Sequence, residues 1–250
     1  MALIKIAVIN QSTVLTNAQI EAAVPALQKQ VRLDFAPVWG VDADLVFVQK
    51  DAQPPPGAWW LLILDDADQA DALGYHELTD EGLPLGKVFA GTDQTYNSAW
   101  TVTASHELLE MLGDPDINLS AFVQTGYNTG TFYSYEVCDA CEMDDQGYVI
   151  DGVKVSDFVY PAWFEGFRQV GSTQFDHLKH IDTPFKLLPG GYAYVLDVPS
   201  GLGWYQIDEP LPPPSAPARK SRRTLGSRRQ RRATRKEWQA SKPRYDRSRE

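Results

Sequence analysis

The spacing of apolar and polar residues in the first third of the chain predicts a strand, a helix and then further strands. Residues 3–9 form a nearly continuous apolar run, which is typical of a buried strand. Residues 18–31 place apolar side chains at helical spacing, and the preceding Thr16-Asn17 pair provides an N-cap. Residues 74–85 lack either pattern and are expected to be irregular. Short apolar runs between turn residues predict four more strands, over residues 33–39, 45–48, 59–64 and 87–90.

The middle of the chain contains one strong helical pattern and then loses its regularity. Residues 97–112 are predicted to form a helix, with Val102 and Leu109 on its apolar face. A Gly-Asp-Pro sequence ends this helix, because Gly favours the C-cap and Pro cannot continue the helix. Beyond residue 116 we expect irregular backbone, interrupted by a hairpin over residues 148–155 and late strands over 192–198 and 203–207. The mixture predicts the α/β (α+β) class, with a mixed sheet packed against the helix.

Charge divides the chain into an acidic body and a basic tail. The formal net charge is -10, but residues 1–217 carry 9 Lys and Arg side chains against 30 Asp and Glu, whereas residues 218–250 carry 14 against 3. Five prolines in residues 210–217 predict an extended linker. Because 43% of the chain is hydrophobic, residues 1–209 can form a folded domain with a sizeable core. The tail over residues 218–250 is too polar to fold and is expected to be disordered.

The chain has only two cysteines, Cys138 and Cys141, which excludes a disulfide scaffold and favours a reducing compartment. The N-terminus lacks the pattern of a secretory signal, and no apolar run approaches the ~20 residues that span a bilayer. We therefore expect no membrane partner and a cytoplasmic or virion-associated protein. Two buried thiols are the simplest interpretation of the Cys-x-x-Cys pair. A redox pair, or half of a zinc site completed by His177 and His180, remains an alternative.

Residues 106–116 contain side chains that can bind a metal ion. Positions i and i+4 share one face of a helix, so His106 and Glu110 can hold one ion together. Glu107 lies beside that face, where its carboxylate can take a proton from a water molecule whose pKa the ion lowers. The arrangement predicts metal-assisted hydrolysis. A solvated helix carboxylate is the alternative interpretation of Glu110, since Glu favours helices.

The same segment resembles the zincin metallopeptidase motif HExxH, with Glu110 in place of the second His, and the longer metzincin pattern HExxHxxGxxH. Gly113 falls on the glycine of that pattern and Asp116 on its third ligand. The resemblance implies a zincin-like fold, Zn²⁺ bound by His106, Glu110 and Asp116, Glu107 as the general base, and a peptide or protein substrate. The predicted order of a strand, a helix, several strands and then the metal helix is also similar to the N-terminal subdomain of zincins.

The acidic ligand set leaves the metal and its third ligand open. Carboxylate-rich sites favour harder ions, so Ca²⁺ and Mn²⁺ are alternatives to Zn²⁺. Asp114 competes with Asp116 for the third position. His76 stands alone in the sequence, and we expect it on the surface or hydrogen-bonded in the core. The acidic segment that follows the helix offers further ligands: Glu136, Asp139 or Glu142.

The basic tail predicts a second kind of partner. Its arginines form an electrostatic footprint for nucleic acid, with contacts expected from Arg222, Arg223, Arg228, Arg229, Arg231 and Arg232. Binding through phosphates would be sensitive to salt and independent of base sequence. A tail that only solubilises the chain, or folds back on the acidic body, is the alternative. The tail also supports a second functional hypothesis, a non-catalytic structural protein of phage or virion type with a zincin-like scaffold.

Overall fold

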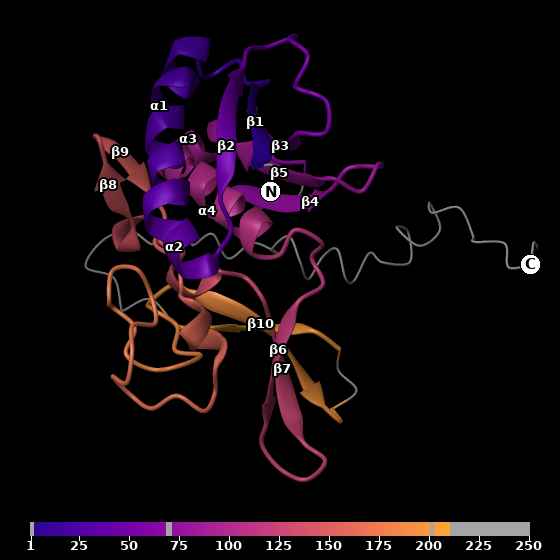
Figure 1. Ribbon diagram of the computed structural model, residues 1–250, viewed down its shortest axis with the longest axis vertical. Helices are drawn as coiled ribbons and strands as arrows, with labels where there is room; N and C mark the ends of the chain where they lie inside the picture. The colour runs from indigo at the N-terminus through magenta and orange to yellow at the C-terminus, as the bar shows by residue number, and fades with distance from the viewer. Residues whose placement is uncertain (1–2, 69–71, 201–202, 211–250) are drawn as a thin grey trace, which may run out of the picture.

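The computed structural model describes residues 3–68, 72–200 and 203–210, which form two larger sheets (Figure 1). The first is a five-stranded mixed sheet with the strand order β2-β1-β3-β5-β4. Strand β4 pairs antiparallel with β5 at one edge, and the other pairings are parallel. The strands are β1 (Ile4–Asn10), β2 (Ala43–Val48), β3 (Trp59–Leu64), β4 (Gly74–Leu78) and β5 (Pro84–Phe89). The mixed α/β class is confirmed.

The apolar runs of the first third correspond to the central strands of this sheet. The strands predicted over residues 3–9, 45–48 and 59–64 are confirmed as β1, β2 and β3. Ile6, Ala7 and Val8 of β1 are buried in succession. Consecutive burial explains the continuous run, because strands of a parallel sheet are covered on both faces.

Strand β4 corrects the expectation that residues 74–85 are irregular. A short turn joins β4 to β5, in which Thr79 N donates to Leu83 O (2.7 Å) and Leu83 N donates to Thr79 Oγ1 (3.1 Å). The apolar pattern did not reveal this strand, because it carries the polar His76 and Glu77 in succession. Its place in the fold is fixed by backbone pairing with β5.

A long helical segment follows β1. Helix α1 (Asn17–Lys29) begins with a capping box, in which Gln19 N donates to Thr16 Oγ1 and Thr16 N donates to Gln19 Oε1. The helix continues through a π-helical stretch, η1 (Gln30–Phe35), into α2 (Ala36–Trp39). The strand predicted over residues 33–39 is therefore wrong. Phe35 and Trp39 are four residues apart on one helical face, and their rings stack at 5.6 Å.

The second half of the described chain adds an antiparallel sheet and a hairpin. The sheet has the order β11-β10-β7-β6 and occupies the lower part of Figure 1. Its members β6 (Ser120–Gln124) and β7 (Gly130–Ser134) were not predicted, whereas β10 (Tyr192–Val198) and β11 (Tyr205–Asp208) were expected. The predicted hairpin is confirmed as β8 (Tyr148–Ile150) and β9 (Val153–Val155). Its turn residues Asp151 and Gly152 both have positive φ, as tight hairpins require.

Helix α4 (Trp100–Gly113) confirms the helix predicted over residues 97–112 and lies at the centre of the fold. It follows α3 (Ala90–Thr95) and packs against β4, β5 and the hairpin strand β9. Its residues from Val102 to Leu112 are all buried, so polar side chains on this helix face protein. A Cβ added to Gly113 would lie 2.8 Å from Val137 Cγ1, so this glycine allows residues 135–142 to approach the end of the helix.

Three short 3₁₀ helices lie in the second half of the described residues: η2 (Asp139–Cys141), η3 (Asp144–Gln146) and η4 (Pro161–Phe164).

Within the described ranges, no helix combines the length and apolar character needed to cross a bilayer. Residues 211–217 of the predicted linker and the whole predicted tail, with its six candidate arginines, lie outside the described residues.

Candidate metal centre

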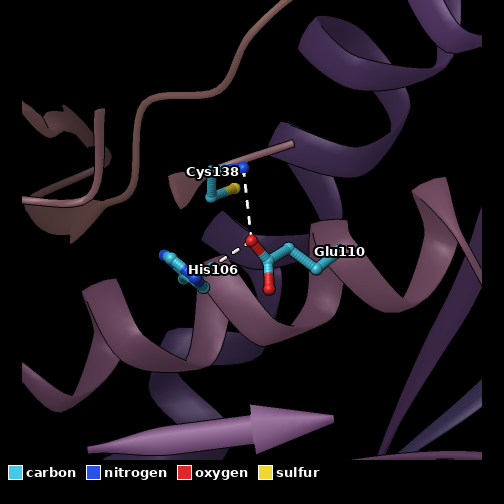
Figure 2. Close-up of side chains that lie close together, drawn as sticks. All are labelled: His106, Glu110 and Cys138. Carbon is cyan, nitrogen blue, oxygen red and sulfur yellow. Dashed lines mark hydrogen bonds and ion pairs between the residues drawn. The ribbon is translucent and has the colours of Figure 1, made fainter. Parts of the chain in front are cut away.

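Helix α4 directs His106 and Glu110 to the same side. Their side chains meet with His106 Nε2 3.1 Å from Glu110 Oε1, as the i and i+4 spacing predicts (Figure 2). Glu107 projects from the neighbouring face toward β4. None of the three side chains is solvated, because each residue is at most 4% exposed. Solvation therefore does not explain these carboxylates.

The segment after β7 covers His106 and Glu110 from a second side. Asp139, at the start of η2, places Oδ1 3.3 Å from His106 Nε2. The backbone N–H of Cys138 donates to Glu110 Oε1 at 3.4 Å (Figure 2). Donor atoms of His106, Glu110 and Cys138 lie within 4.8 Å of one another, close enough to hold a metal ion.

Strand β4 contributes a histidine that the sequence did not identify as a ligand. His76 Nδ1 lies 3.5 Å from Glu110 Oε2 and 3.7 Å from Glu107 Oε2. His76 Nε2 lies 4.0 Å from Glu136 Oε2, and donor atoms of His76, Glu110 and Glu136 form a second candidate group. The sequence of β4 contained one sign of this contact, because a glycine inside a strand marks a place where another group comes close to the backbone. Gly74, two residues before His76, faces Glu107 Oε1.

Burial and charge act against each other in this centre. Burial lowers the pKa of His106, but the charge of Glu110 and the hydrogen bond with Asp139 outweigh it and hold the pKa well above 6.5. Burial raises the pKa of Glu110, whereas the charge of His106 lowers it below its ordinary value overall. Burial raises the pKa of Asp139 to about 7, and the charge of Glu110 acts in the same direction. Two carboxylates therefore compete for one imidazole.

The centre contains buried nitrogen atoms that a metal ion would satisfy. Among the described residues, neither ring nitrogen of His76 has a hydrogen-bond partner. Buried polar atoms are normally hydrogen-bonded. Imidazole nitrogen, carboxylate oxygen and thiolate sulfur are all ligands for divalent transition ions. The residues of this centre therefore fit a bound metal ion.

The two aspartates expected after the helix are placed elsewhere. The Asp114 carboxylate accepts the backbone N–H groups of Asn118 (3.1 Å) and Leu119 (2.9 Å), so it stabilises the turn that follows α4. Asp116 is exposed. Neither belongs to a candidate metal-binding group of the described residues. The third member of the candidate group with His106 and Glu110 is Cys138, and Asp139 lies beside it with Oδ1 3.3 Å from His106 Nε2.

The other candidate ligands that the sequence suggested lie outside the two candidate groups of this centre. Glu142 is buried close to the centre, and its charge contributes to the raised pKa of Tyr192, but it belongs to no candidate group of the described chain. Cys141 is a buried free thiol. The His177 ring stacks on Phe158 at 5.1 Å. No candidate metal-binding group of the described residues joins the Cys-x-x-Cys pair with His177 or His180.

No protein-family model, curated protein or solved structure matches this chain.

The contact between β4 and α4 gives a first prediction. A Cβ at Gly74 would lie 2.7 Å from both Glu107 Oε1 and Thr103 Cγ2 and 2.8 Å from Lys87 O. Gly74→Ala is therefore expected to push β4 from α4 and to lower the free energy of unfolding by roughly 1–3 kcal/mol, as overpacking does. Urea denaturation measures this. Gly166→Ala is the control, because its Cβ would meet only ordinary contacts at 3.4 Å or more. Equal midpoints for both variants would contradict the close packing.

Proposed function

We propose that this protein is a metal-dependent hydrolase of the metallopeptidase class. The observation that carries the proposal is the convergence of His106, Glu107 and Glu110 on one buried helix with Asp139 across from them. In this proposal His106 and Glu110 hold the ion together with Asp139, whose Oδ1 lies 3.3 Å from His106 Nε2, and the Cys138 sulfur is a further donor within reach. Asp139 takes the place that the motif gave to Asp116. The order of a strand, a helix, several strands and then α4 supports the zincin-like interpretation, because it is the order that the motif's family implies.

Glu107 is the proposed general base. A bound ion supplies Lewis acidity, which lowers the pKa of the attacking water and polarises the substrate carbonyl. Burial raises the pKa of Glu107, which brings the base closer to neutral pH and makes it a better proton acceptor. Its Oε2 lacks a hydrogen-bond partner among the described residues, so this oxygen is available to accept a proton. The proposed substrate is a peptide or an unfolded protein, and Zn²⁺ is the proposed ion, with Mn²⁺ or Ca²⁺ as alternatives.

Glu107→Gln tests the catalytic role. The substitution keeps the shape of the side chain but removes the base, so we expect hydrolysis of a fluorescent peptide library to fall by about 100-fold or more. Metal content should stay unchanged, since Glu107 is not among the proposed ligands of this ion. Glu81→Gln is the matched control, because Glu81 is exposed in the turn before β5. Equal hydrolysis by Glu107→Gln and the native protein would contradict the proposal.

One observation favours a second candidate function. His76, His106, Glu110 and Asp139 are all at most 4% exposed, and structural metal sites are closed whereas catalytic sites keep an open position. The alternative we propose is a non-catalytic structural protein, of phage or virion type, in which the ion stabilises the fold and the basic tail contacts nucleic acid. The Glu107→Gln comparison separates the two. A protein without hydrolytic activity, in which His106→Ala removes the ion and lowers the melting temperature, supports the structural function.

A further inference from the structure

The Glu110 carboxylate faces two different groups of ligands. Its Oε1 lies 3.1 Å from His106 Nε2 and accepts the backbone N–H of Cys138 at 3.4 Å. Its Oε2 lies 3.5 Å from His76 Nδ1. Figure 2 shows one carboxylate oxygen on the side of His106 and Cys138 and the other turned away from them. Glu110 is thus the residue shared by the two candidate groups in this centre, one with His106 and Cys138 and one with His76 and Glu136.

His76 provides an independent indication of a ligand on the second side. Its ring is 1% exposed, and neither ring nitrogen has a hydrogen-bond partner among the described residues. Three carboxylates approach the ring, those of Glu107 and Glu110 near Nδ1 and that of Glu136 near Nε2. A buried imidazole without hydrogen bonds is uncommon in a folded core. A bound cation would satisfy one of its nitrogens and draw the surrounding carboxylates together.

The carboxylates beside His76 are as deeply buried as its ring. They belong to Glu107, Glu110 and Glu136, and each of these residues is at most 4% exposed. Burying a carboxylate is costly unless an opposite charge or a metal accompanies it. An ion beside His76 would place a positive charge among these three carboxylates.

We propose that the centre holds two divalent ions, with the Glu110 carboxylate bridging them. His106 and Asp139 bind the first ion, which is the one in the proposed function, and His76 and Glu136 bind the second. This inference rests on the proposed function only for the first ion. One imidazole with two carboxylates is a ligand set for Zn²⁺ or Mn²⁺. In two-metal hydrolases such a pair holds both the attacking and the leaving oxygen, so the second ion extends the proposed chemistry.

Metal stoichiometry of the full chain tests the proposal. The protein is stripped with a chelator, dialysed against Zn²⁺ or Mn²⁺ alone, freed of excess ion and analysed by plasma mass spectrometry. We expect two ions per native chain, and one in either His76→Gln or His106→Gln. His180→Gln is the control and should retain two, because this exposed histidine belongs with Asp157 and Asp176 to a separate candidate group outside the centre. Circular dichroism melts check that each variant is folded, and Glu136→Gln replaces His76→Gln if the latter fails to fold.

A spectroscopic readout locates the two ions relative to each other. Two Mn²⁺ ions that share the Glu110 carboxylate should be spin-coupled, so the native protein should lack the electron paramagnetic resonance spectrum of an isolated ion. His76→Gln should restore that spectrum. An uncoupled spectrum from a native chain that holds two ions would overturn the bridging role of Glu110.

The ion counts of the native chain and its variants distinguish failure of the second metal site from failure of the proposed hydrolase. One ion per native chain, retained in His76→Gln and lost in His106→Gln, overturns the second site and leaves the proposed hydrolase intact. If the native chain holds one ion and both His76→Gln and His106→Gln lose it, the two histidines share a single site, and the inference is also overturned. Loss of an ion in His180→Gln would place it in the loop around Asp176, outside the centre. Two ions with full hydrolysis by Glu107→Gln would uphold the inference and contradict the proposed mechanism.

Discussion

Glu110→Ala is expected to lower the free energy of unfolding of the metal-free protein by roughly 3–5 kcal/mol, the effect of removing one partner from a buried ion pair. The two Glu110 oxygens face the only two histidines of the centre, His106 at 3.1 Å and His76 at 3.5 Å. The pKa of Glu110 is lowered in spite of its burial, mainly through the charge of His106, so the fold favours the ionised carboxylate. Without it, buried imidazoles lose their nearest counter-charge.

Urea denaturation in the presence of a chelator measures this effect without a contribution from bound metal. Glu21→Ala is the matched control, because Glu21 is an exposed helical glutamate in α1 and its loss should change stability by no more than about 0.5 kcal/mol. Glu110→Gln separates charge from volume, since it preserves the side-chain shape. A chelated Glu110→Ala protein as stable as Glu21→Ala would show that the carboxylate does not pair with the histidines.

The same substitution should also abolish tight metal binding. Glu110 belongs to both candidate groups, so its loss removes a ligand from each at once. The native protein should be stabilised by added Zn²⁺, because an ion that binds only the folded state shifts the unfolding equilibrium. Glu110→Ala should show no such shift. The two effects are distinct, since the first is measured with chelator and the second with metal.

The local part of the centre could be predicted from the sequence, because helical geometry fixes it. The pair His106 and Glu110 needs only the i and i+4 spacing, and the apolar pattern placed the helix within a few residues of α4. The hairpin around Asp151 and Gly152 followed in the same way from local turn chemistry. Features set within one or two turns of backbone are visible in a single sequence.

The rest of the centre depends on contacts between distant segments. His76 reaches Glu110 because β4 pairs with β5 under α4, and Asp139 reaches His106 because residues 135–142 fold back over the helix. No spacing in the sequence encodes either approach. The motif pointed to Asp116, but α4 ends at Gly113, after which the backbone turns and leaves Asp116 exposed. Helical spacing cannot place a residue beyond the end of the helix.

Asp157→Asn is expected to stabilise the protein at neutral and alkaline pH. Asp157 Oδ1 accepts the backbone N–H groups of Phe158 (2.8 Å) and Leu178 (3.3 Å), and the neighbouring Asp176 carboxylate accepts those of His180 and Ile181. Burial, and then the charge of Asp176, raise the pKa of Asp157 to about 8. The folded protein therefore keeps a proton on Asp157 that the unfolded chain releases above pH 3.8.

The proton that the fold keeps on Asp157 determines how the free energy of unfolding changes with pH. Between pH 3.8 and about 8 the folded state binds more protons than the unfolded state, so the Asp157 contribution to stability falls as the pH rises. An asparagine carbonyl accepts the same two backbone N–H groups, and its amide can donate toward Asp176 without binding a proton. The variant should match the native protein near pH 4 and exceed it by roughly 5 kcal/mol at pH 8, because the pKa of Asp157 is raised from 3.8 to about 8 and each pKa unit corresponds to ~1.4 kcal/mol.

Urea denaturation from pH 4 to pH 9, with chelator present throughout, measures the difference between the two proteins. Asp80→Asn is the control, because Asp80 is exposed in the turn between β4 and β5 and should leave the pH profile of the native protein unchanged. Parallel profiles for the native protein and Asp157→Asn would mean that Asp157 is already ionised in the fold, because only a retained proton makes the gap widen with pH. A gap that widens from pH 4 to pH 8 would instead show that the fold keeps a proton on Asp157.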